Sequence, residues 1–492
     1  MKLIPRPEQE GAIQRMLTEP THAVALGSQQ DTGKTLMLCE VIVRAEFKRV
    51  LIVGVKDTFN AWHKRLLAQS EGSIELLRID ATKKGRENFE RLLAGDDAHF
   101  FVGHQFLASK DWGRVPVLGN DGEPTGEYKR KHLGVYKKMR PLDALVSDES
   151  QIHSNRKSNG AGTIRAIPTN WKFALSGTIA GNQIVNLHTI GRWLWPTVQT
   201  ETGEFLVDPS FYRWRDQWCE VESKYVGGAR PVAVVLGEKN PGAIVSSWPC
   251  WIRLLSPAGN VPEPELIHVD LDPQEQAIYS QCEEEGVMWL EQNGNLEPIV
   301  MNLPVTKRTR LRTAALGVMS IDSGDVVHFA SDAQSTKMRK LREILDGEGW
   351  AGKQAVIFTH SKTFAYMAAA RMNGAGYATG LWTGDLPSKK RDVLLEAFTS
   401  GEVRYIVAVI QSLSRGYDGL QTAANRVVWM SRSDDTEQND QAARRVFRTG
   451  GDLKDYRSVE IVANETYDLG VFNADRAKVT SMNASLEAKL AS

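Results

Sequence analysis

The chain has 492 residues, of which 42% are hydrophobic, and its 60 basic and 60 acidic residues cancel. A chain of this length and composition is expected to fold into two or three globular domains. The charge balance excludes a uniformly positive protein, so any binding of nucleic acid has to come from a local basic surface.

The cysteine spacing and the hydropathy exclude two further classes. The four cysteines, Cys39, Cys219, Cys250 and Cys282, lie far apart without a Cys-x-x-Cys pair, so we expect neither a zinc site nor a disulfide framework. The N-terminus has no signal-peptide pattern, and no apolar run approaches the ~20 residues needed to span a bilayer. We therefore expect a cytoplasmic protein without a membrane partner.

The first predicted element is a helix within residues 3–17, where a proline-bounded start precedes apolar residues at helical spacing. Gln9 lies beside its first turn. Either Gln9 is a solvated helix residue, or its amide, which carries both donors and an acceptor, hydrogen-bonds the edge of an adenine.

An apolar run, Ala23–Leu26, leads into the sequence Gly-Ser-Gln-Gln-Asp-Thr-Gly-Lys-Thr at residues 27–35. A strand, a tight turn and a helix start in this order direct backbone NH groups and the helix dipole at one point, as in phosphate-binding loops. Lys34 would then reach the β- and γ-phosphates, and the Thr35 hydroxyl would bind Mg²⁺. Because Ser28 stands where the strict pattern has glycine, the loop alone leaves a plain helix start as an alternative.

The next elements alternate between strands and helices. A helix is predicted over residues 36–47, and continuous aliphatic runs at 49–55, 99–102 and 142–146 predict strands that are buried on both faces. This alternation predicts a doubly wound α/β domain, whose ligands lie at the carboxyl ends of its parallel strands.

The run 142–146 is followed by two adjacent carboxylates, Asp148 and Glu149. Two carboxylates at the end of a buried strand repel each other and lose solvation, so they require a cation or a chemical role. A Mg²⁺ ion held by Asp148, with Glu149 polarising the attacking water, supplies both. The alternative is an exposed acidic turn. The next predicted strand, 171–175, ends in the small residues 176–182, which either lie near a γ-phosphate or form a plain turn.

The order of these blocks resembles the first motor domain of superfamily 2 helicases, more specifically their Snf-type, double-strand-translocating branch. The residues that carry the resemblance are Arg6–Gln9 for the Q motif, Ser28–Thr35 for motif I, Leu51–Trp62 for motif Ia, Asp148–Gln151 for the Asp-Glu-x-His box and Ser176–Asn182 for motif III. The sequence departs from the pattern at Gln151 in place of His, at Ser176 and Ile179 in place of Thr and Pro, and at Asp31 in place of a loop glycine. The resemblance implies ATP and Mg²⁺, with the nucleotide held by Gln9, Ser28, Thr32, Gly33, Lys34 and Thr35.

Two regions are harder to interpret. Residues 109–141 form an insertion with turn signals and the basic residues Lys129, Arg130, Lys131, Lys137, Lys138 and Arg140. These are either a solvated face or contacts to a phosphate backbone flanked by Trp112, Tyr128 and Tyr136. The segment 193–251 holds six tryptophans, which we expect to pack rather than to stack on bases. Residues 306–315 are expected to form a basic helix that tracks DNA.

A second α/β pattern follows without a phosphate loop, with helices predicted at 338–345 and 386–398 and strands at 355–359 and 405–410. It looks like the second RecA-like lobe of such a motor, which completes the nucleotide site from across a cleft.

Two blocks of this lobe carry the resemblance further. Residues 412–421 are similar to motif V, with Arg415-Gly416-Tyr417-Asp418 at its centre, and residues 437–450 are similar to motif VI, with Arg444 in place of glycine. The resemblance places Gly416 and Asp418 at the nucleotide. On a helix, Gln441, Arg445 and Arg448 would share one face, which suits a triphosphate.

The predicted fold is therefore α/β: two RecA-like, doubly wound parallel-sheet lobes at 1–195 and 333–492, with a mostly helical insertion and linker at 196–332. The predicted function is an ATP-dependent DNA helicase or translocase that contacts mainly the DNA backbone, acts as a monomer and resembles compact bacteriophage helicases in a bacterial or phage-infected cytoplasm. Two alternatives stay open: a duplex translocase or annealing motor that never separates strands, and a non-catalytic nucleic-acid binding module with a decayed ATP site. RNA is not excluded as the polymer.

Overall fold

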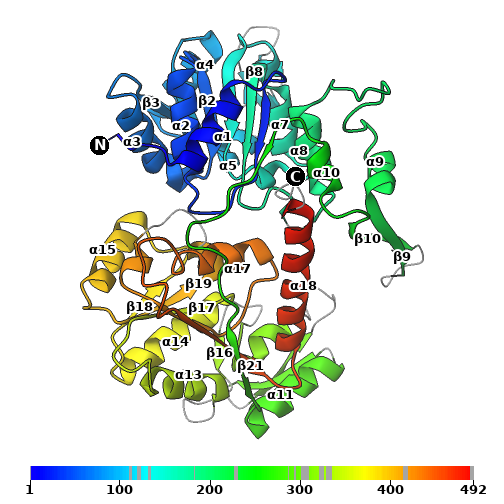
Figure 1. Cartoon of the computed structure of the whole chain (residues 1–492). Coiled ribbons are helices and arrows are strands. Elements are labelled where there is room, and N and C mark those ends of the chain that lie inside the picture. Colours follow the sequence, from blue (N-terminus) through cyan, green and yellow to red (C-terminus); the bar gives the residue numbers. More distant parts are fainter. Residues whose placement is uncertain are drawn as a thin grey trace. The chain divides into compact units, whose positions relative to one another are not determined.

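The computed structural model (Figure 1) describes residues 2–109, 114–118, 124–130, 134–181, 183–225, 231–285, 287–292, 295–300, 310–320, 326–328, 335–413 and 419–487. The chain divides into two compact units: residues 1–257 with 480–492, and residues 258–479. The segment 196–332, for which the sequence predicts a separate insertion, is divided between these units. No helix among the described residues is long and apolar enough to cross a membrane.

The first unit is built on a seven-stranded sheet with the order β11-β1-β8-β7-β2-β4-β3. Every neighbouring pair of strands is parallel. The strands are β1 (Ala23–Leu26), β2 (Val50–Gly54), β3 (Leu76–Ile79), β4 (His99–Gly103), β7 (Leu142–Ser147), β8 (Thr169–Leu175) and β11 (Trp251–Ile252). Because all strands run the same way, the segments that follow β1, β8 and β7 leave the same edge of the sheet as neighbours.

Helices cover both faces of this sheet, because successive strand residues point to opposite sides. In β1, Val24 and Leu26 pack in one core with α1 (Pro7–Leu17), α2 (Lys34–Arg44) and α3 (Phe59–Gln69). Ala23 and Ala25 pack in the other core with α4 (Lys83–Ala94), α5 (His104–Ala108), α7 (Asn159–Ala166) and α8 (Asn186–Leu194). The doubly wound arrangement is confirmed.

The described residues between 196 and 332 mix helices and strands, so the prediction of a mostly helical segment is wrong. They contain α9 (Phe211–Trp218), the antiparallel hairpin β9 (Cys219–Lys224) and β10 (Val232–Glu238), α10 (Ala243–Ser247), β11, β12 (Glu265–Val269), α11 (Pro273–Glu285) and the antiparallel pairs β13–β14 (Val287–Gln292, Asn295–Val300) and β15–β16 (Val318–Ser320, Val326–His328). The predicted packing role of the tryptophans is confirmed, because those of 193–251 contribute to one core of the first sheet.

The second unit is built on a six-stranded parallel sheet with the order β12-β21-β20-β17-β19-β18. Its further strands are β17 (Ala355–Thr359), β18 (Thr379–Trp382), β19 (Tyr405–Val409), β20 (Arg426–Trp429) and β21 (Arg457–Ala463). One face packs on α13 (Thr336–Asp346) and α14 (Lys362–Gly374), and the other on α15 (Ser388–Thr399), α16 (Ile410–Leu413) and α17 (Thr436–Ala443). The last helix is α18 (Tyr467–Glu487). Two RecA-like α/β lobes are thus confirmed.

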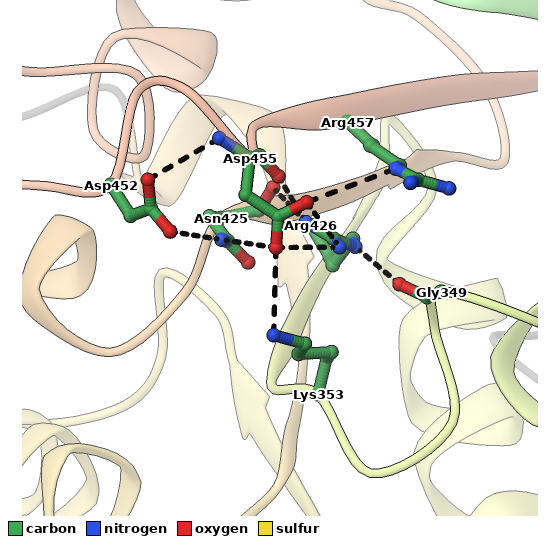
Figure 2. A network of polar contacts seen from close by, with 7 residues as sticks. All are labelled: Gly349, Lys353, Asn425, Arg426, Asp452, Asp455 and Arg457. Atoms are coloured by element: carbon green, nitrogen blue, oxygen red, sulfur yellow. Dashed lines mark hydrogen bonds and ion pairs between the residues drawn. The ribbon is translucent and has the colours of Figure 1, made fainter.

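A polar network fixes the loop between α17 and β21 (Figure 2). Arg426, whose side chain is only 1% exposed, donates to both carboxylate oxygens of Asp455 at 3.0 Å and to the Gly349 carbonyl at 2.8 Å. Lys353 adds a second cation, 3.4 Å from the same carboxylate. Because a buried guanidinium without its carboxylate is costly, this network holds Asp455 and the adjoining loop against the start of β20.

Candidate functional site

The loop after β1 is closed by its own lysine. Lys34 begins α2, and its Nζ donates to the carbonyls of Ser28 at 2.8 Å and Gln29 at 3.0 Å. Gly33 and Asp31 have left-handed backbones, with φ of +80° and +66°. Aspartate tolerates this conformation better than most residues, which explains how it occupies a position where the helicase motif has glycine.

Gln9, which lies on α1, reaches this loop. Its Nε2 donates to the Thr32 carbonyl at 2.8 Å, while its Oε1 accepts from the Arg6 amide at 2.8 Å. A Cβ at Gly33 would lie 2.5 Å from Gln9 Nε2, so the glycine leaves room for this contact. Each end of the amide has capacity for one more hydrogen bond. Gln9 therefore braces the loop, and its bond to an adenine remains a proposal.

A segment that the sequence reading missed runs along the other side of the loop. The amides of Gly27 and Gln29 donate to the carbonyls of Ile252 and Leu254, and the Leu254 amide donates to the Ser28 hydroxyl at 2.9 Å. Ser28, which stands in the position of the motif glycine, is thus used as a hydrogen-bond acceptor. β11 is only two residues long, so its sequence carries little strand signal.

Gly27 is required by packing against β11. A Cβ at this position would overlap the indole ring of Trp251. We expect Gly27→Ala to lower the thermal unfolding midpoint, because overpacking a well-packed core typically costs about 1–3 kcal/mol. The matched control is Gly11→Ala in α1, where nothing lies within 4 Å of the added methyl group and the helix gains a better helix former. An equal midpoint for the Gly27 variant and the wild type would contradict this account.

The two carboxylates lie at the end of β7, at the same edge of the sheet. Oδ2 of Asp148 accepts from the indole nitrogen of Trp62 at 2.9 Å, and Oδ1 accepts from the Glu149 amide at 3.1 Å. Burial, together with the Glu149 carboxylate, raises the pKa of Asp148 to about 6, and the Lys34 ammonium acts in the opposite direction. A bound cation would stabilise the ionised Asp148 carboxylate and so offset the effects of burial and of the Glu149 charge, as predicted from the sequence.

Glu149 has a left-handed backbone with φ of +50°, which turns the chain sharply after β7. Its Oε2 accepts from Nε2 of Gln151 at 2.9 Å. Gln151, which replaces the histidine of the Asp-Glu-x-His box, therefore orients the neighbouring carboxylate.

The loop after β8, residues 176–181, lies between the loop after β1 and the loop after β7, because β8 is the strand between β1 and β7. A Cβ at Gly177 would lie 3.6 Å from Gln30 of the first loop, and a Cβ at Gly181 would lie 3.6 Å from Gln151. The Ser176 hydroxyl is buried and accepts from the Thr178 amide at 2.9 Å. Residues 27–35, 148–151 and 176–181 therefore form one continuous surface, although more than 100 positions separate the first segment from the other two.

The donor set fits a Mg²⁺ ion that is bound together with a nucleotide. Among the residues that the structure describes, no group of three or more His, Cys, Asp or Glu side chains could hold a metal ion. Mg²⁺ is typically held by one or two carboxylates, with phosphates and water completing its shell. Asp148 and Thr35, the two ligands that the sequence predicts, would supply such a partial set of oxygen ligands. When bound, the ion would neutralise charge on the phosphates.

The residues predicted from motif VI lie in the second unit, and their arrangement differs from the prediction. α17 ends at Ala443, and Arg445 and Arg448 follow in turns, so they do not share a helical face with Gln441. Arg444, which stands in the position of the motif glycine, is buried, donates to Asp440 at 2.9 Å and donates to the Gly259 carbonyl at 3.3 Å. Gly416 and Asp418 of motif V lie outside the described residues.

Two predictions of nucleic-acid contacts can be compared with the structure. Arg312 of the expected DNA-tracking helix is 5% exposed and donates to Asp434 at 2.6 Å, so this residue is structural and the prediction is wrong for it. Residues 306–309 lie outside the described range. In the 109–141 insertion, Tyr136 packs against Phe89 with ring centroids 6.1 Å apart, and Arg140 donates to Asp97. Lys137 and Lys138 are exposed. Trp112 and the Tyr128 side chain lie outside the described part.

Residues 336–450 match the family model described as helicase conserved C-terminal domain. The chain is 42% identical over 72 residues to an ATP-dependent RNA helicase RhlB of Shewanella frigidimarina and 40% identical over 76 residues to RhlB of Shewanella baltica. These alignments cover 15% of this chain and 16% and 17% of the relatives, so the chain spans about one sixth of the length of the curated relatives it matches. The Sulfolobus solfataricus SWI2/SNF2 ATPase core in complex with dsDNA aligns with a TM-score of 0.40 and 17% identity, covering 99% of this chain and 94% of that one.

Proposed function

We propose that the protein is a nucleic-acid-dependent ATPase that works as a helicase or translocase. The observation that carries this proposal is the meeting of three loops at one sheet edge, which brings the Lys34 loop beside the Asp148–Glu149 pair. The match of residues 336–450 to the helicase C-terminal domain supports the same function for the second unit.

The proposed reaction is attack of water on the γ-phosphate of ATP. Lys34 and the amides of its loop would hold the phosphates, and Thr35 and Asp148 would hold Mg²⁺. Glu149 would orient the water and accept its proton. The guanidinium groups of Arg445 and Arg448 would stabilise charge that develops on the phosphate.

The remaining site residues have binding roles. Ser28, Thr32 and Gly33 shape the phosphate loop, and Gln9 would read the base. The resemblance to motifs V and VI supports nucleotide-binding roles for Gly416, Asp418 and Gln441.

The polymer is proposed to be DNA, gripped mainly through its phosphates by a monomer of the Snf-type branch. This rests on the sequence motifs of the first unit. RNA is the alternative that the names of the RhlB relatives favour, although their alignments cover little of the chain. Contacts to phosphates would make binding weakly sequence-specific and strongly salt-dependent.

ATP hydrolysis without polymer and with single-stranded DNA, duplex DNA or RNA, each across a salt series, tests the proposal. Stimulation by duplex DNA alone would support the translocase, and stimulation by single strands would support a strand-separating helicase. If only RNA stimulated hydrolysis, the polymer would be RNA and not DNA. If no condition gave hydrolysis, the motor function would be wrong and the non-catalytic binding module would take its place.

Arg448→Ala tests the second unit. We expect turnover to fall by about 10³-fold, as for removal of arginine fingers in other phosphoryl-transfer enzymes, while affinity for DNA changes little. The control is Arg457→Ala, which removes an exposed arginine at the start of β21, a strand of the same unit. DNA affinity from fluorescence anisotropy and turnover are measured together. Equal losses of both would assign Arg448 to grip on DNA instead of hydrolysis.

A further inference from the structure

We propose that Trp62 is a positioning residue that orients the Asp148 carboxylate for Mg²⁺. The inference rests on the proposed ATPase function, and it assigns a role to a side chain that the motif comparison treated only as the end of motif Ia. Trp62 does not touch the substrate in this proposal. It acts through the single hydrogen bond from its indole nitrogen.

The topology of the first sheet brings Trp62 to Asp148. β2 pairs with β7, with Val53 opposite Ser147, so both strands end at the same level. A single 3₁₀ turn (Lys56–Thr58) follows β2 and leads directly into α3. The first turn of α3 therefore lies beside the end of β7, and Trp62 reaches across it although the two residues are 86 positions apart in sequence.

The hydrogen bonds around Asp148 fix its carboxylate at both oxygens. Oδ2 accepts from the Trp62 indole nitrogen at 2.9 Å, and Oδ1 accepts from the Glu149 backbone amide at 3.1 Å. Each carboxylate oxygen can accept a second bond, so both retain a lone pair for a metal ion or a metal-bound water. With one donor on each side, the plane of the carboxylate is determined before any ligand arrives. Such fixed orientation strengthens metal sites.

Packing alone does not require tryptophan here. Trp62 is 1% exposed and lies in the apolar core between α2, α3 and the sheet, where phenylalanine would also be accepted with some loss of contact. What phenylalanine lacks is the N–H group. If that group were absent, Oδ2 of Asp148 would lose the indole donor, and only the Glu149 amide at Oδ1 would orient the carboxylate.

The test compares wild type with Trp62→Phe in binding of a fluorescent ADP analogue, with EDTA and across a Mg²⁺ titration. We expect unchanged affinity in EDTA, a loss of about 10-fold in the Mg²⁺-dependent gain in affinity, and a fall in kcat without a matching rise in KM for ATP. A second variant carries β-(3-benzothienyl)alanine at position 62, which keeps the shape of the indole and lacks the N–H. It should reproduce the loss without a cavity.

The matched control is Trp195→Phe. Trp195 is also 1% exposed in the first unit, and its indole nitrogen donates to the Thr21 hydroxyl at 3.1 Å, away from the three loops of the site. Its variant should lose stability without changing the Mg²⁺ dependence.

Three results would overturn the assignment. If both position-62 variants gained as much affinity for the ADP analogue on adding Mg²⁺ as wild type does, the indole N–H would have no role in metal binding. If the position-62 variants bound the ADP analogue more weakly in EDTA as well as in Mg²⁺, Trp62 would act through packing and not through the metal ligand. The same Mg²⁺ effect in Trp195→Phe would make it a general consequence of lost stability.

Failure of the underlying function has a different signature. If wild type bound no ADP, or if Lys34→Ala hydrolysed ATP as well as wild type, the ATPase assignment would fall and this inference with it. A different outcome would overturn only the role of Trp62. In that outcome, wild type hydrolyses ATP, Lys34→Ala does not, and Trp62→Phe has the same Mg²⁺ dependence as wild type.

Discussion

Replacing Lys34 with alanine is expected to lower ATP turnover by about 10²–10³-fold, the loss typical when one preorganised cationic or hydrogen-bond donor is removed from a developing anion. The Lys34 ammonium donates to two carbonyls of its own loop. It is therefore held at the mouth of the loop, where phosphates can replace those carbonyls as its partners. Nucleotide affinity should fall with turnover, because the same charge contacts the phosphates in both states.

The control for this variant is Lys172→Ala. Lys172 is the central residue of β8, and its Nζ also donates to two backbone carbonyls, those of Trp193 at 2.9 Å and Leu194 at 3.4 Å. Both variants lose a partly buried ammonium and two hydrogen bonds, but only Lys34 faces the proposed site. Turnover is measured with saturating polymer, alongside thermal unfolding. Equal turnover in the two variants would show that lost stability, and not lost phosphate binding, explains the result.

Continuous aliphatic runs made much of the fold predictable. β1, β2, β4, β7, β17 and β19 are buried along nearly their whole length, so most of their residues are apolar and the runs are visible in the sequence, with Asp143 in β7 as one polar interruption. β3 is buried only at its two ends, and β11 has two residues. Such strands exist because a neighbouring strand is already in place, and that cause cannot be seen in a local window.

The candidate site also has parts that a local sequence pattern predicts and parts that it does not. The phosphate loop is one continuous stretch of sequence and the Asp148–Glu149 pair is another, so a role for each could be predicted from residue type and spacing. The bonds from Trp62 to Asp148 and from Leu254 to Ser28 join residues 86 and 226 positions apart, and only the strand order brings them together. A local pattern cannot indicate either contact.

The arginines of the second unit show how tertiary contacts override a helical pattern. Residues 437–448 have the composition of a helix, yet α17 ends at Ala443. Just beyond the arginines, a Cβ at Gly451 would lie 2.7 Å from the carbonyl of Gln421, the last residue of motif V, so this part of the chain packs directly against the end of that motif. A continued helix would carry the chain away from that contact. The predicted helical face was therefore wrong, and the roles of Arg445 and Arg448 stay predictions.

Glu149→Gln is expected to separate hydrolysis from binding. The amide keeps the size of the carboxylate, and its oxygen can still accept the bond from Gln151, so the left-handed turn after β7 should persist. A glutamine cannot take a proton from water, and general-base catalysis contributes typically 10²–10⁴-fold, so turnover should fall by about that factor. Binding of the Mg²⁺–nucleotide complex, which is anionic overall, should stay or tighten, because a negative charge that repels the phosphates is removed.

Glu46→Gln is the control, because Glu46 also has a left-handed backbone, with φ of +52°, and lies exposed after α2. Its variant makes the same chemical change in the same backbone conformation and should leave turnover unchanged. Single-turnover hydrolysis and equilibrium binding of the ADP analogue distinguish the outcomes. If Glu149→Gln lost binding and hydrolysis together, the carboxylate would hold Mg²⁺ rather than water. If it retained full turnover, the base would have to be another group, and Asp148–Glu149 would be an acidic turn of the kind that its sequence alone allows.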